Sequence, residues 1–227
     1  MDTAVFRAWI VSAAGVIEAN RDHLTQLDAA IGDADHGVNL ARGFAAVTAA
    51  LEGPAETDAP ATPGAQGPPG ASDAPANPGA VLTLTGSTLI STVGGASGPL
   101  YGVAFRRAGK ALGAAVTVDL PSLADALEAA LAGVQQLGGA REGDKTMVDA
   151  LAPATRAFGK AIADGAQAAD ALSALAEAAA AGAAATISMQ ARKGRASYLG
   201  PRSVGHEDPG AASTALILAA LRDVATR

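Results

Sequence analysis

The chain has 227 residues, a formal net charge of −6 at pH 7 and no cysteine. It therefore forms no disulfide and has no thiolate chemistry, which also argues against a zinc site. The acidic balance argues against a surface for nucleic acid or for an anionic membrane. Hydrophobic residues make up 49% of the chain but aromatic residues only 3%. This composition predicts closely packed helices with small side chains between them rather than strands.

The N-terminus has no basic leader, and we expect no apolar run to reach membrane length. We therefore expect a soluble cytoplasmic protein that does not bind a membrane.

Apolar residues at helical spacing predict a first helix over residues 5–17, a short helical piece over 21–30 and a longer helix over 37–51. Residues 52–80 are rich in Pro, Gly, Ala and Asp and have no periodicity. Such a composition buries too little apolar surface to offset chain entropy, so we expect a flexible loop there.

Six further helices are predicted at residues 81–93, 99–113, 122–137, 146–162, 168–189 and 209–225. Pro153 is expected to kink or break the helix that contains it. Eight sizeable helices joined mostly by short loops predict an all-α fold, an antiparallel up-and-down bundle or helical barrel formed by one domain.

Three aspartates crowd into the turn before the helix at 37–51. Carboxylates as close as Asp28, Asp33 and Asp35 repel one another unless a cation neutralises them. Their oxygen atoms suit Mg²⁺ better than zinc, and Gly32 and Gly37 allow the sharp turn that aims them inward. The turn therefore predicts a magnesium site; the alternative is a solvated acidic turn that caps a helix.

Four loops differ in composition from the alanine-rich segments around them: 28–39, 91–101, 137–147 and 189–210. They follow the first, third, fifth and seventh sizeable helices. Because helices of alternating direction return every second loop to the same end of a bundle, the four loops are predicted to converge on one composite site.

Two of these loops carry groups suited to phosphate. The backbone N–H groups of the glycine-rich loop can approach an anion, and Ser97 is predicted to cap the helix that follows; an ordinary turn is the alternative. The last loop carries Arg195, whose fork suits phosphate oxygens, although a solvated basic loop is also open. Asp208 is predicted to cap the helix that begins at Pro209.

Residues 138–146 nearly match a phosphate-binding P-loop, but Asp144 occupies the position of the required lysine and no strand precedes it. We therefore reject a P-loop. Carboxylates for a metal, a glycine-rich turn, helix N-termini and an arginine-bearing loop together favour phosphoryl transfer, which needs a metal at the phosphates and positive groups facing developing charge.

Four segments resemble the nucleotide-binding L subunit of dihydroxyacetone kinases, the DhaL type. They are LDAAIGDADHGVNLARGF (27–44), STVGGASGPLYG (91–102), EGDKTMVDALAP (142–153) and ARKGRASYLGPRSVGHEDPGA (191–211). The stretch 54–78 departs from the family pattern and looks like an insertion. We expect it to be disordered, to lie at the end opposite the site and to be removable.

The resemblance implies an eight-helix antiparallel barrel with ADP or ATP and two Mg²⁺ ions at one end. It assigns metal ligation to Asp28, Asp33 and Asp35, and makes these three and Arg195 the catalytic residues. It places the nucleotide against His36, Gly37, Val38, Asn39, Ala96, Ser97, Gly138, Met147, Arg195, Asp208, Pro209 and Gly210.

The resemblance also implies a phosphotransferase that works with partners. In the phosphoenolpyruvate-dependent type, ADP stays bound and a phosphocarrier M subunit rephosphorylates it in place. The phosphoryl group then passes to dihydroxyacetone on a separate K subunit, and His36 and His206 are expected to position groups rather than carry phosphate. Two alternatives stay open: an ATP-exchanging kinase component for another ketose, polyol or acyl substrate, and a module that signals nucleotide state to a transcriptional regulator.

Overall fold

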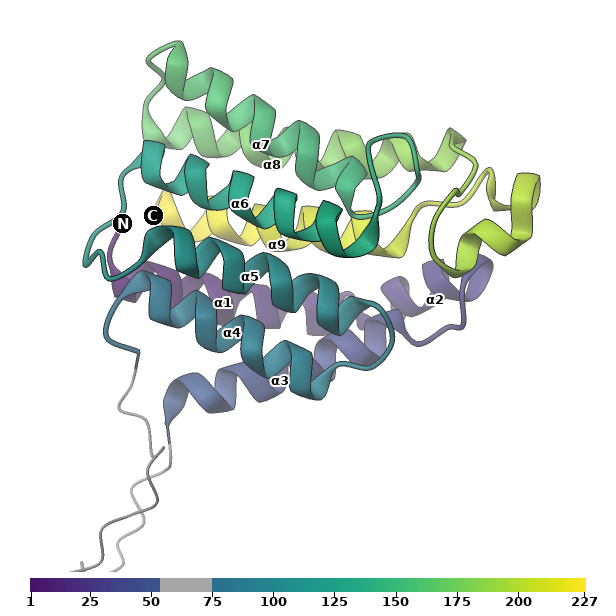
Figure 1. Ribbon diagram of the computed structural model, residues 1–227, viewed down its shortest axis with the longest axis horizontal. Helices are drawn as coiled ribbons and strands as arrows, with labels where there is room; N and C mark the ends of the chain where they lie inside the picture. The colour runs from purple at the N-terminus through teal and green to yellow at the C-terminus, as the bar shows by residue number, and fades with distance from the viewer. Residues whose placement is uncertain (54–74) are drawn as a thin grey trace, which may run out of the picture.

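The computed structural model describes residues 1–53 and 75–227, which form helices with no strand among them. The α-helices, shown in Figure 1, are α1 (Thr3–Ala19), α2 (Arg21–Ile31), α3 (His36–Glu52), α4 (Pro78–Thr92), α5 (Ser97–Leu112), α6 (Leu120–Gly138), α7 (Val148–Ala163), α8 (Ala168–Ala185) and α9 (Pro209–Ala225). Two 3₁₀ helices, η1 (Thr186–Ser188) and η2 (Arg195–Ser203), lie between α8 and α9. The all-α prediction is confirmed.

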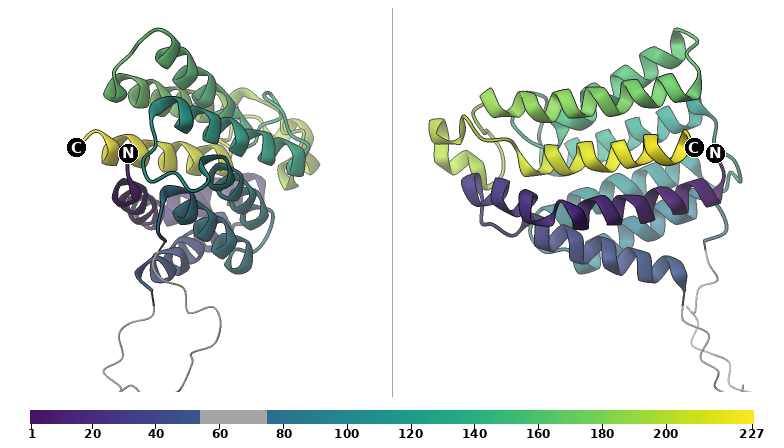
Figure 2. Two further views of the ribbon diagram at one scale, coloured as in Figure 1. Left: turned by 60° about the vertical axis from the view of Figure 1, so that its left-hand side comes forward. Right: turned by 180° about the vertical axis from the view of Figure 1, so that it is seen from behind.

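The long helices pack in a closed circuit. α1 packs against α3, each helix from α3 to α8 packs against the next, and α9 packs against both α8 and α1. The short α2 lies against α3. Figure 2 shows the chain running back and forth, with both termini at the same end. This order of neighbours is the one that the predicted barrel requires.

Four of the seven aromatic side chains gather in the core between α1, α3 and α5. The ring of Trp9 lies 5.9 Å from that of Phe6 and 5.8 Å from that of Phe105, measured between centroids. Phe44 lies 6.3 Å from Phe105 with its ring nearly perpendicular. The indole N–H of Trp9 donates to the carbonyl of Ile217 on α9 (2.9 Å), so this buried polar group is satisfied.

Glycine allows α4 and α5 to approach closely. A Cβ at Gly86 would lie 2.5 Å from the carbonyl oxygen of Gly102, and a Cβ at Gly109 would lie 2.5 Å from the carbonyl oxygen of Gly79. Both distances are too short for real contacts, so the helices come this close only because side chains are missing. This pair shows the small-residue packing that the composition predicts.

α7 runs without a break through Pro153. The proline ring removes the hydrogen bond to the carbonyl of Asp149 within the helix. That carbonyl faces α8 at Gly182, where a Cβ would lie 2.1 Å from its oxygen. Of the two predicted outcomes, a break at Pro153 is therefore wrong, because the helix continues, while a kink stays a prediction. The glycine at 182 leaves room for the Asp149 carbonyl.

The predicted insertion, 54–78, is too long at its C-terminal end. Asn77 accepts the N–H of Ala80 (2.8 Å) as the N-cap of α4, and Pro78 is buried in the first turn. These residues therefore belong to α4 and its cap. Residues 54–74, which carry the rest of that prediction, lie outside the described residues. The ends of α3 and α4 that flank them lie opposite η2 (Figure 1).

One segment, Ala168–Ser188, is long and apolar enough to pass as a membrane span by length and composition, with a mean hydropathy of 1.3. The expectation that no apolar run reaches this length is therefore wrong. In the structure, α8 packs between α7 and α9 and buries Leu172 and Leu175. Its alanines make it long and apolar, as expected for a helix in a small-residue core.

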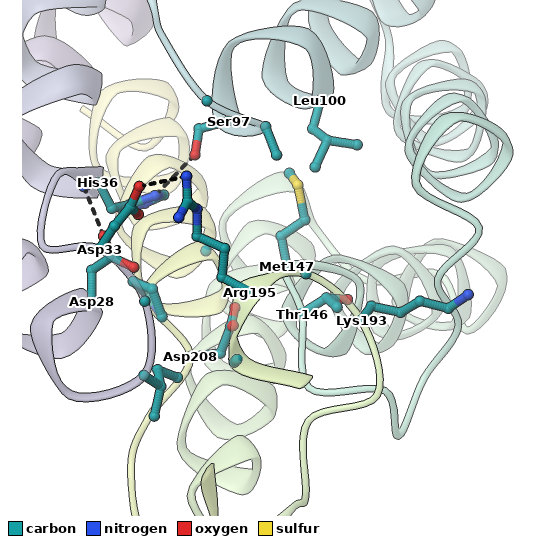
Figure 3. Close-up of a pocket in the computed structure, with 18 of the residues that line it drawn as sticks. Asp28, Asp33, His36, Ser97, Leu100, Thr146, Met147, Lys193, Arg195 and Asp208 are labelled. Atoms are coloured by element: carbon teal, nitrogen blue, oxygen red, sulfur yellow. Dashed lines mark hydrogen bonds and ion pairs between the residues drawn. The ribbon is translucent and has the colours of Figure 1, made fainter. Parts of the chain in front are cut away.

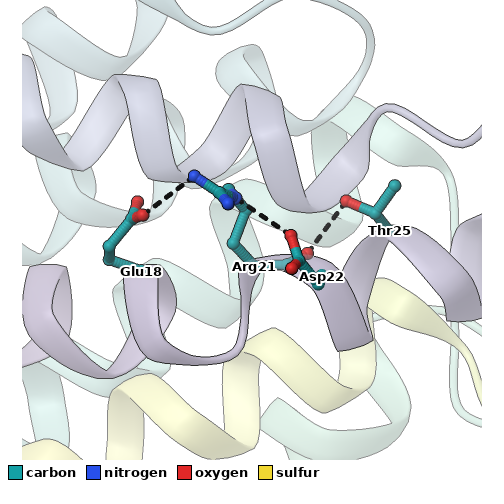
Figure 4. Close-up of polar contacts among 4 residues, drawn as sticks. All are labelled: Glu18, Arg21, Asp22 and Thr25. Carbon is teal, nitrogen blue, oxygen red and sulfur yellow. Dashed lines mark hydrogen bonds and ion pairs between the residues drawn. The ribbon is translucent and has the colours of Figure 1, made fainter.

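An ion-paired turn joins α1 to α2, the helix that leads into the acidic turn (Figure 4). Arg21 pairs with Glu18 (3.0 Å) and Asp22 (3.1 Å). The hydroxyl of Thr25 donates to the carbonyl of Arg21 (2.8 Å). α3 packs directly on this turn, because a Cβ at Gly37 would lie 2.0 Å from the Arg21 carbonyl oxygen. The close contact fixes the direction of α2.

Candidate functional site

The four singled-out loops meet at one end of the bundle, where they enclose a cleft of about 190 Å³. In Figure 3, Asp28, Asp33 and His36 lie to one side of Arg195, and Leu100 and Met147 lie to the other. One wall of the cleft is therefore acidic and another is apolar. The convergence predicted from the order of the loops is confirmed.

The acidic wall is a cluster of three carboxylates. One oxygen atom from each of Asp28, Asp33 and Asp35 lies within 4.8 Å of the other two. Oδ2 of the buried Asp28 accepts the backbone N–H groups of Asp35 (2.9 Å) and His36 (3.1 Å). A Cβ at Gly32 would lie 2.0 Å from Asp28 Oδ1, so the turn needs glycine there. A cluster of hard oxygen atoms this close suits a divalent cation.

His36 links two sides of the cleft. Its imidazole shares hydrogen bonds with Ser97 of α5 through Nδ1 (3.0 Å) and with Ser213 of α9 through Nε2 (2.9 Å). Burial lowers the pKa of His36, although the Asp28 and Asp35 carboxylates act in the opposite direction. The prediction that Ser97 caps α5 is wrong, because α5 begins at Ser97 without a side-chain cap. The Ser97 hydroxyl is hydrogen-bonded to the imidazole of His36 instead.

Tyr101 extends this polar network along α9. Its hydroxyl lies 2.7 Å from Ser213 Oγ and 2.9 Å from Thr214 Oγ1, and it also donates to the carbonyl of Gly210 (3.1 Å). Burial raises the pKa of Tyr101 to about 12, so the phenol stays protonated at neutral pH. Together, Tyr101 and His36 hold the N-terminal ends of α5 and α9 against the cleft, and helix N-termini favour anions.

The floor of the cleft is the turn before α7, which contributes Lys145, Thr146 and Met147. The carboxylate of Asp149 braces this turn by accepting the backbone N–H groups of Gly143 (2.5 Å) and Thr146 (2.7 Å). Lys145 points away from solvent into the protein, and burial lowers the pKa of its ammonium group. The turn therefore presents its backbone and Met147 to the cleft.

Asp208 caps α9, as predicted, since its Oδ2 accepts the N–H of Ala211 (2.7 Å). Desolvation raises the pKa of Asp208 to about 7, and the Asp149 carboxylate acts in the same direction. The N–H of Ala211 and the ammonium group of Lys145 oppose this shift. The wall of the cleft therefore contains a carboxyl group that changes charge near neutral pH.

Residues 190–202, here called the lid, lie beside the acidic turn. Ile31 at the end of α2 packs against three apolar side chains of the lid: Ala191, Ala196 and Leu199. Arg195 of the lid, whose side chain is 70% exposed, forms an ion pair with Asp33 (3.0 Å; Figure 3). One apolar and one charged contact thus hold the lid against the acidic turn.

Most of the predicted site residues line the cleft: Asp28, Asp33, Asp35, His36, Ala96, Ser97, Met147, Arg195, Asp208, Pro209 and Gly210. Four others are not among the lining residues: Gly37, Val38, Asn39 and Gly138. Gly37 packs on α2, and Val38 is exposed. Asn39 Oδ1 accepts a hydrogen bond from Arg42 (2.9 Å). Gly138 lies beside Leu100, whose Cδ2 would be 3.3 Å from a Cβ at position 138.

Ten further lining residues were not predicted as site residues: Ile31, Gly32, Gly95, Leu100, Tyr101, Lys145, Thr146, Lys193, Gly194 and Ala196. Leu100 and Tyr101 lie in the segment singled out at 91–101, but they also belong to a helix whose apolar pattern predicts core packing, and that pattern does not indicate that its first turn faces a cleft. Lys145 and Thr146 lie in the loop singled out at 137–147, where the comparison with a P-loop depended on Asp144. A lysine between an aspartate and a threonine in a glycine-rich loop was the available signal for Lys145.

The fold and the cleft define an all-helical domain in which a carboxylate cluster, an arginine-bearing lid and two helix N-termini surround one site. Residues 70–223 match the DAK2 domain family. The chain is 39% identical over 210 residues to the "PEP-dependent dihydroxyacetone kinase, ADP-binding subunit DhaL" of Escherichia coli K12, covering 92% of this chain and 91% of that one. It therefore belongs to the Dak2 family.

Two further relatives are similar over nearly the whole chain. A "PTS-dependent dihydroxyacetone kinase, ADP-binding subunit DhaL" of Lactococcus lactis is 36% identical over 224 residues, which cover 99% of this chain and 97% of that one. The crystal structure of the dihydroxyacetone kinase of C. freundii in complex with AMP-PNP and Mg²⁺ superposes with a TM-score of 0.65 at 27% identity. The match covers 98% of this chain and 34% of that longer one.

Proposed function

We propose that residues 1–227 form one nucleotide-binding domain, the ADP/ATP-binding subunit of a dihydroxyacetone kinase. In this role it transfers a phosphoryl group from Mg²⁺-bound nucleotide to dihydroxyacetone held on a partner K subunit. The observation that carries the proposal is the convergence of four loops on one cleft, with three carboxylates on one wall and Arg195 reaching them. The relatives named as ADP-binding subunits support it.

The carboxylate cluster fits Mg²⁺. Asp28, Asp33 and Asp35 offer only hard oxygen ligands, and the backbone N–H groups bonded to Asp28 already hold its carboxylate in place. Three carboxylates and a diphosphate together carry enough negative charge for two Mg²⁺ ions. The metal bound here supplies charge neutralisation for the phosphoryl oxygen atoms.

The chain's own residues bind and orient the phosphates. Ser97, with Ala96 before it, starts α5, whose free N–H groups face the cleft, and His36 fixes the Ser97 hydroxyl. Arg195 of the lid can stabilise charge that develops during transfer. Leu100 and Met147 form an apolar wall suited to the base of the nucleotide.

The partners reach the nucleotide from the open end of the cleft. Large apolar side chains are exposed around that end, on α3, α6, η1, η2 and the residue after η2: Val38, Leu137, Ile187, Tyr198 and Val204. Exposed apolar groups near a site mark surfaces for protein partners. We assign this surface to the K subunit and to a phosphocarrier M subunit, which has to rephosphorylate the retained ADP at the same opening.

The proposal is tested by phosphoryl transfer in a complex reconstituted with the K subunit of a relative, dihydroxyacetone, Mg²⁺ and ATP labelled in its γ-phosphate. Asp33→Ala should lower the transfer rate by at least about 100-fold, since it removes a metal ligand and the partner of Arg195. Asp22→Ala is the matched control, because this exposed aspartate pairs only with Arg21 and should leave the rate unchanged. Full transfer by Asp33→Ala would contradict the proposal.

A further inference from the structure

Lys145 is the least exposed charged side chain among the described residues, with 1% of its surface accessible. Its ammonium group donates to four backbone carbonyl groups: those of Ser203 (2.7 Å), Thr186 (2.8 Å), Met189 (3.2 Å) and His206. An ammonium group has three N–H donors, so all of them are used and one is shared. The metal and phosphate chemistry proposed above makes no use of this buried charge.

The four carbonyl groups belong to the two stems of the lid. Thr186 and Met189 lie where the chain leaves α8, and Ser203 and His206 lie where it returns to α9. The stems also bond to each other directly, since the N–H of Gly205 donates to the carbonyl of Ile187 (2.7 Å). The N–H of Ala191, at the start of the lid, donates to Ser203 Oγ on the returning stem (2.9 Å). Lys145 thus binds both ends of the lid from the core side.

The backbone of the floor turn aims Lys145 at the stems. Lys145 has a φ of 63°, a left-handed conformation that costs free energy in a residue with a side chain. Asp149 holds the turn in this conformation through Gly143 and Thr146. The lid is attached to the same turn, since the N–H of Arg192 donates to the carbonyl of Asp144 (3.0 Å).

We propose that Lys145 is a positioning residue, whose ammonium group fixes the two stems of the lid on the floor turn and thereby places Arg195 over the carboxylate cluster. The effect on nucleotide rests on the proposed function; the effect on the lid does not. Removing the ammonium group takes this donor from two buried carbonyl groups, those of Thr186 and Ser203, and from two partly buried ones, those of Met189 and His206. Polar groups that lose their partner in this way favour local opening. The lid then spends more time detached from the acidic turn.

The lid carries its own reporter of opening, because it contains four trypsin sites: Arg192, Lys193, Arg195 and Arg202. Lys145→Met keeps the length of the side chain and removes its charge. Without nucleotide or metal, trypsin should cut this variant within the lid at least about tenfold faster than the wild type. Lys160→Met, the same change at an exposed site of α7, is the matched control and should leave the rate unchanged. Equal rates in Lys145→Met and the wild type would overturn the proposal.

The second measurement tests whether Lys145 acts through Arg195. Lys145→Met and Arg195→Gln should each speed the dissociation of ADP in the presence of Mg²⁺, by roughly tenfold. The double variant should dissociate no faster than the faster single variant, since both changes remove the same placement of Arg195. If the increases in dissociation rate of the two single variants multiply in the double variant, Lys145 does not act through Arg195, and its role as a positioning residue is overturned.

Lys145→Ala keeps the proposal testable if Lys145→Met fails to fold. The truncation removes three carbon atoms and the ammonium group of Lys145. n-Propylammonium has three carbon atoms and an ammonium group, so it can fill the space that they leave. Addition of n-propylammonium should restore resistance of the lid to trypsin, or the folded state itself, whereas n-propanol should not. Equal effects of both compounds, or of neither, would show that the charge is not what holds the stems.

The outcomes separate this inference from the proposed function. A wild-type protein that binds no ADP contradicts the proposed function, and the trypsin assay on nucleotide-free protein then decides the role of Lys145 alone. A protein that binds ADP while Lys145→Met matches the wild type in the trypsin assay keeps the proposed function and overturns this inference.

Discussion

Asp208 is a carboxyl group at the cleft wall, and burial raises its pKa to about 7. The folded protein therefore holds a proton at Asp208 between pH 3.8, the ordinary value, and about 7, whereas the unfolded chain has lost it. Deprotonation in this window weakens the folded state, so the contribution of Asp208 to stability falls as pH rises and levels off above about 7.

This sign gives a prediction for Asp208→Asn, which keeps an oxygen acceptor for the cap of α9 but does not titrate. Without nucleotide, the unfolding temperature of the variant relative to that of the wild type should rise between pH 5 and pH 8. Thermal unfolding followed by circular dichroism measures the difference. A difference that stays constant over this range would show that burial does not shift the Asp208 carboxyl group.

The chemistry of single residues predicts the role of each residue better than it predicts the contacts between residues that are far apart in the chain. The carboxylates at 28, 33 and 35 and the cap at Asp208 could be recognised, because each has its role within a few residues of its own position. The bond between Ser97 and His36 and the four carbonyl groups around Lys145 join loops that are far apart in the chain. No local pattern encodes such contacts, so they appear only once the loops are assembled.

At the scale of the elements, the contact of α3 with the start of α2 depends on Gly37. A Cβ at this position would lie 2.0 Å from the backbone oxygen of Arg21, which cannot move without shifting α2 and the acidic turn. Gly37→Ala should therefore lower the free energy of unfolding by roughly 2 kcal/mol, measured by urea denaturation. It should also weaken Mg²⁺-dependent ADP binding.

The matched control is Gly15→Ala in α1, where nothing lies within 4 Å of the added Cβ. Because glycine disfavours helices, this variant should gain about 0.5–1 kcal/mol. If both variants changed stability equally, helix propensity rather than the close approach of α2 and α3 would govern position 37.

The N-cap of α4 leads to a prediction about the segment before it. Replacement of residues 54–74 by a short Gly/Ser linker should leave the unfolding free energy and ADP binding close to those of the wild type. Extension of the replacement through residue 78 removes Asn77 and Pro78 and should cost about 1 kcal/mol or more, because α4 loses its cap. Urea denaturation of both variants measures their free energies of unfolding. A large loss of stability in the variant that lacks only residues 54–74 would contradict the prediction.

Helical periodicity predicted the type and order of the elements, and it erred at their ends. α4 begins earlier than expected because Asn77 and Pro78 start it, and α8 gives way to η1 before residue 189. Pro153 misled the prediction because its effect depends on the space that Gly182 leaves on a neighbouring helix. Such boundaries depend on packing partners, which a single segment does not contain.

At the scale of the whole molecule, the alternating direction of the helices explains how distant loops form one site. The closed circuit of packed helices holds the four loops at one end, and the ends of α3 and α4 that flank residues 54–74 lie at the other. The order of the elements was sufficient to predict this convergence. The depth of the cleft and the docking of the lid required the assembled structure.

The most direct test of the account is mass analysis of the nucleotide released on denaturing the purified, extensively dialysed protein. We expect close to one ADP per chain, retained in the cleft between the carboxylate cluster and the apolar wall. If the protein is empty but binds Mg²⁺·ATP reversibly, the nucleotide is an exchanging substrate and not a retained cofactor. A protein that neither releases nor binds adenine nucleotide would contradict the account.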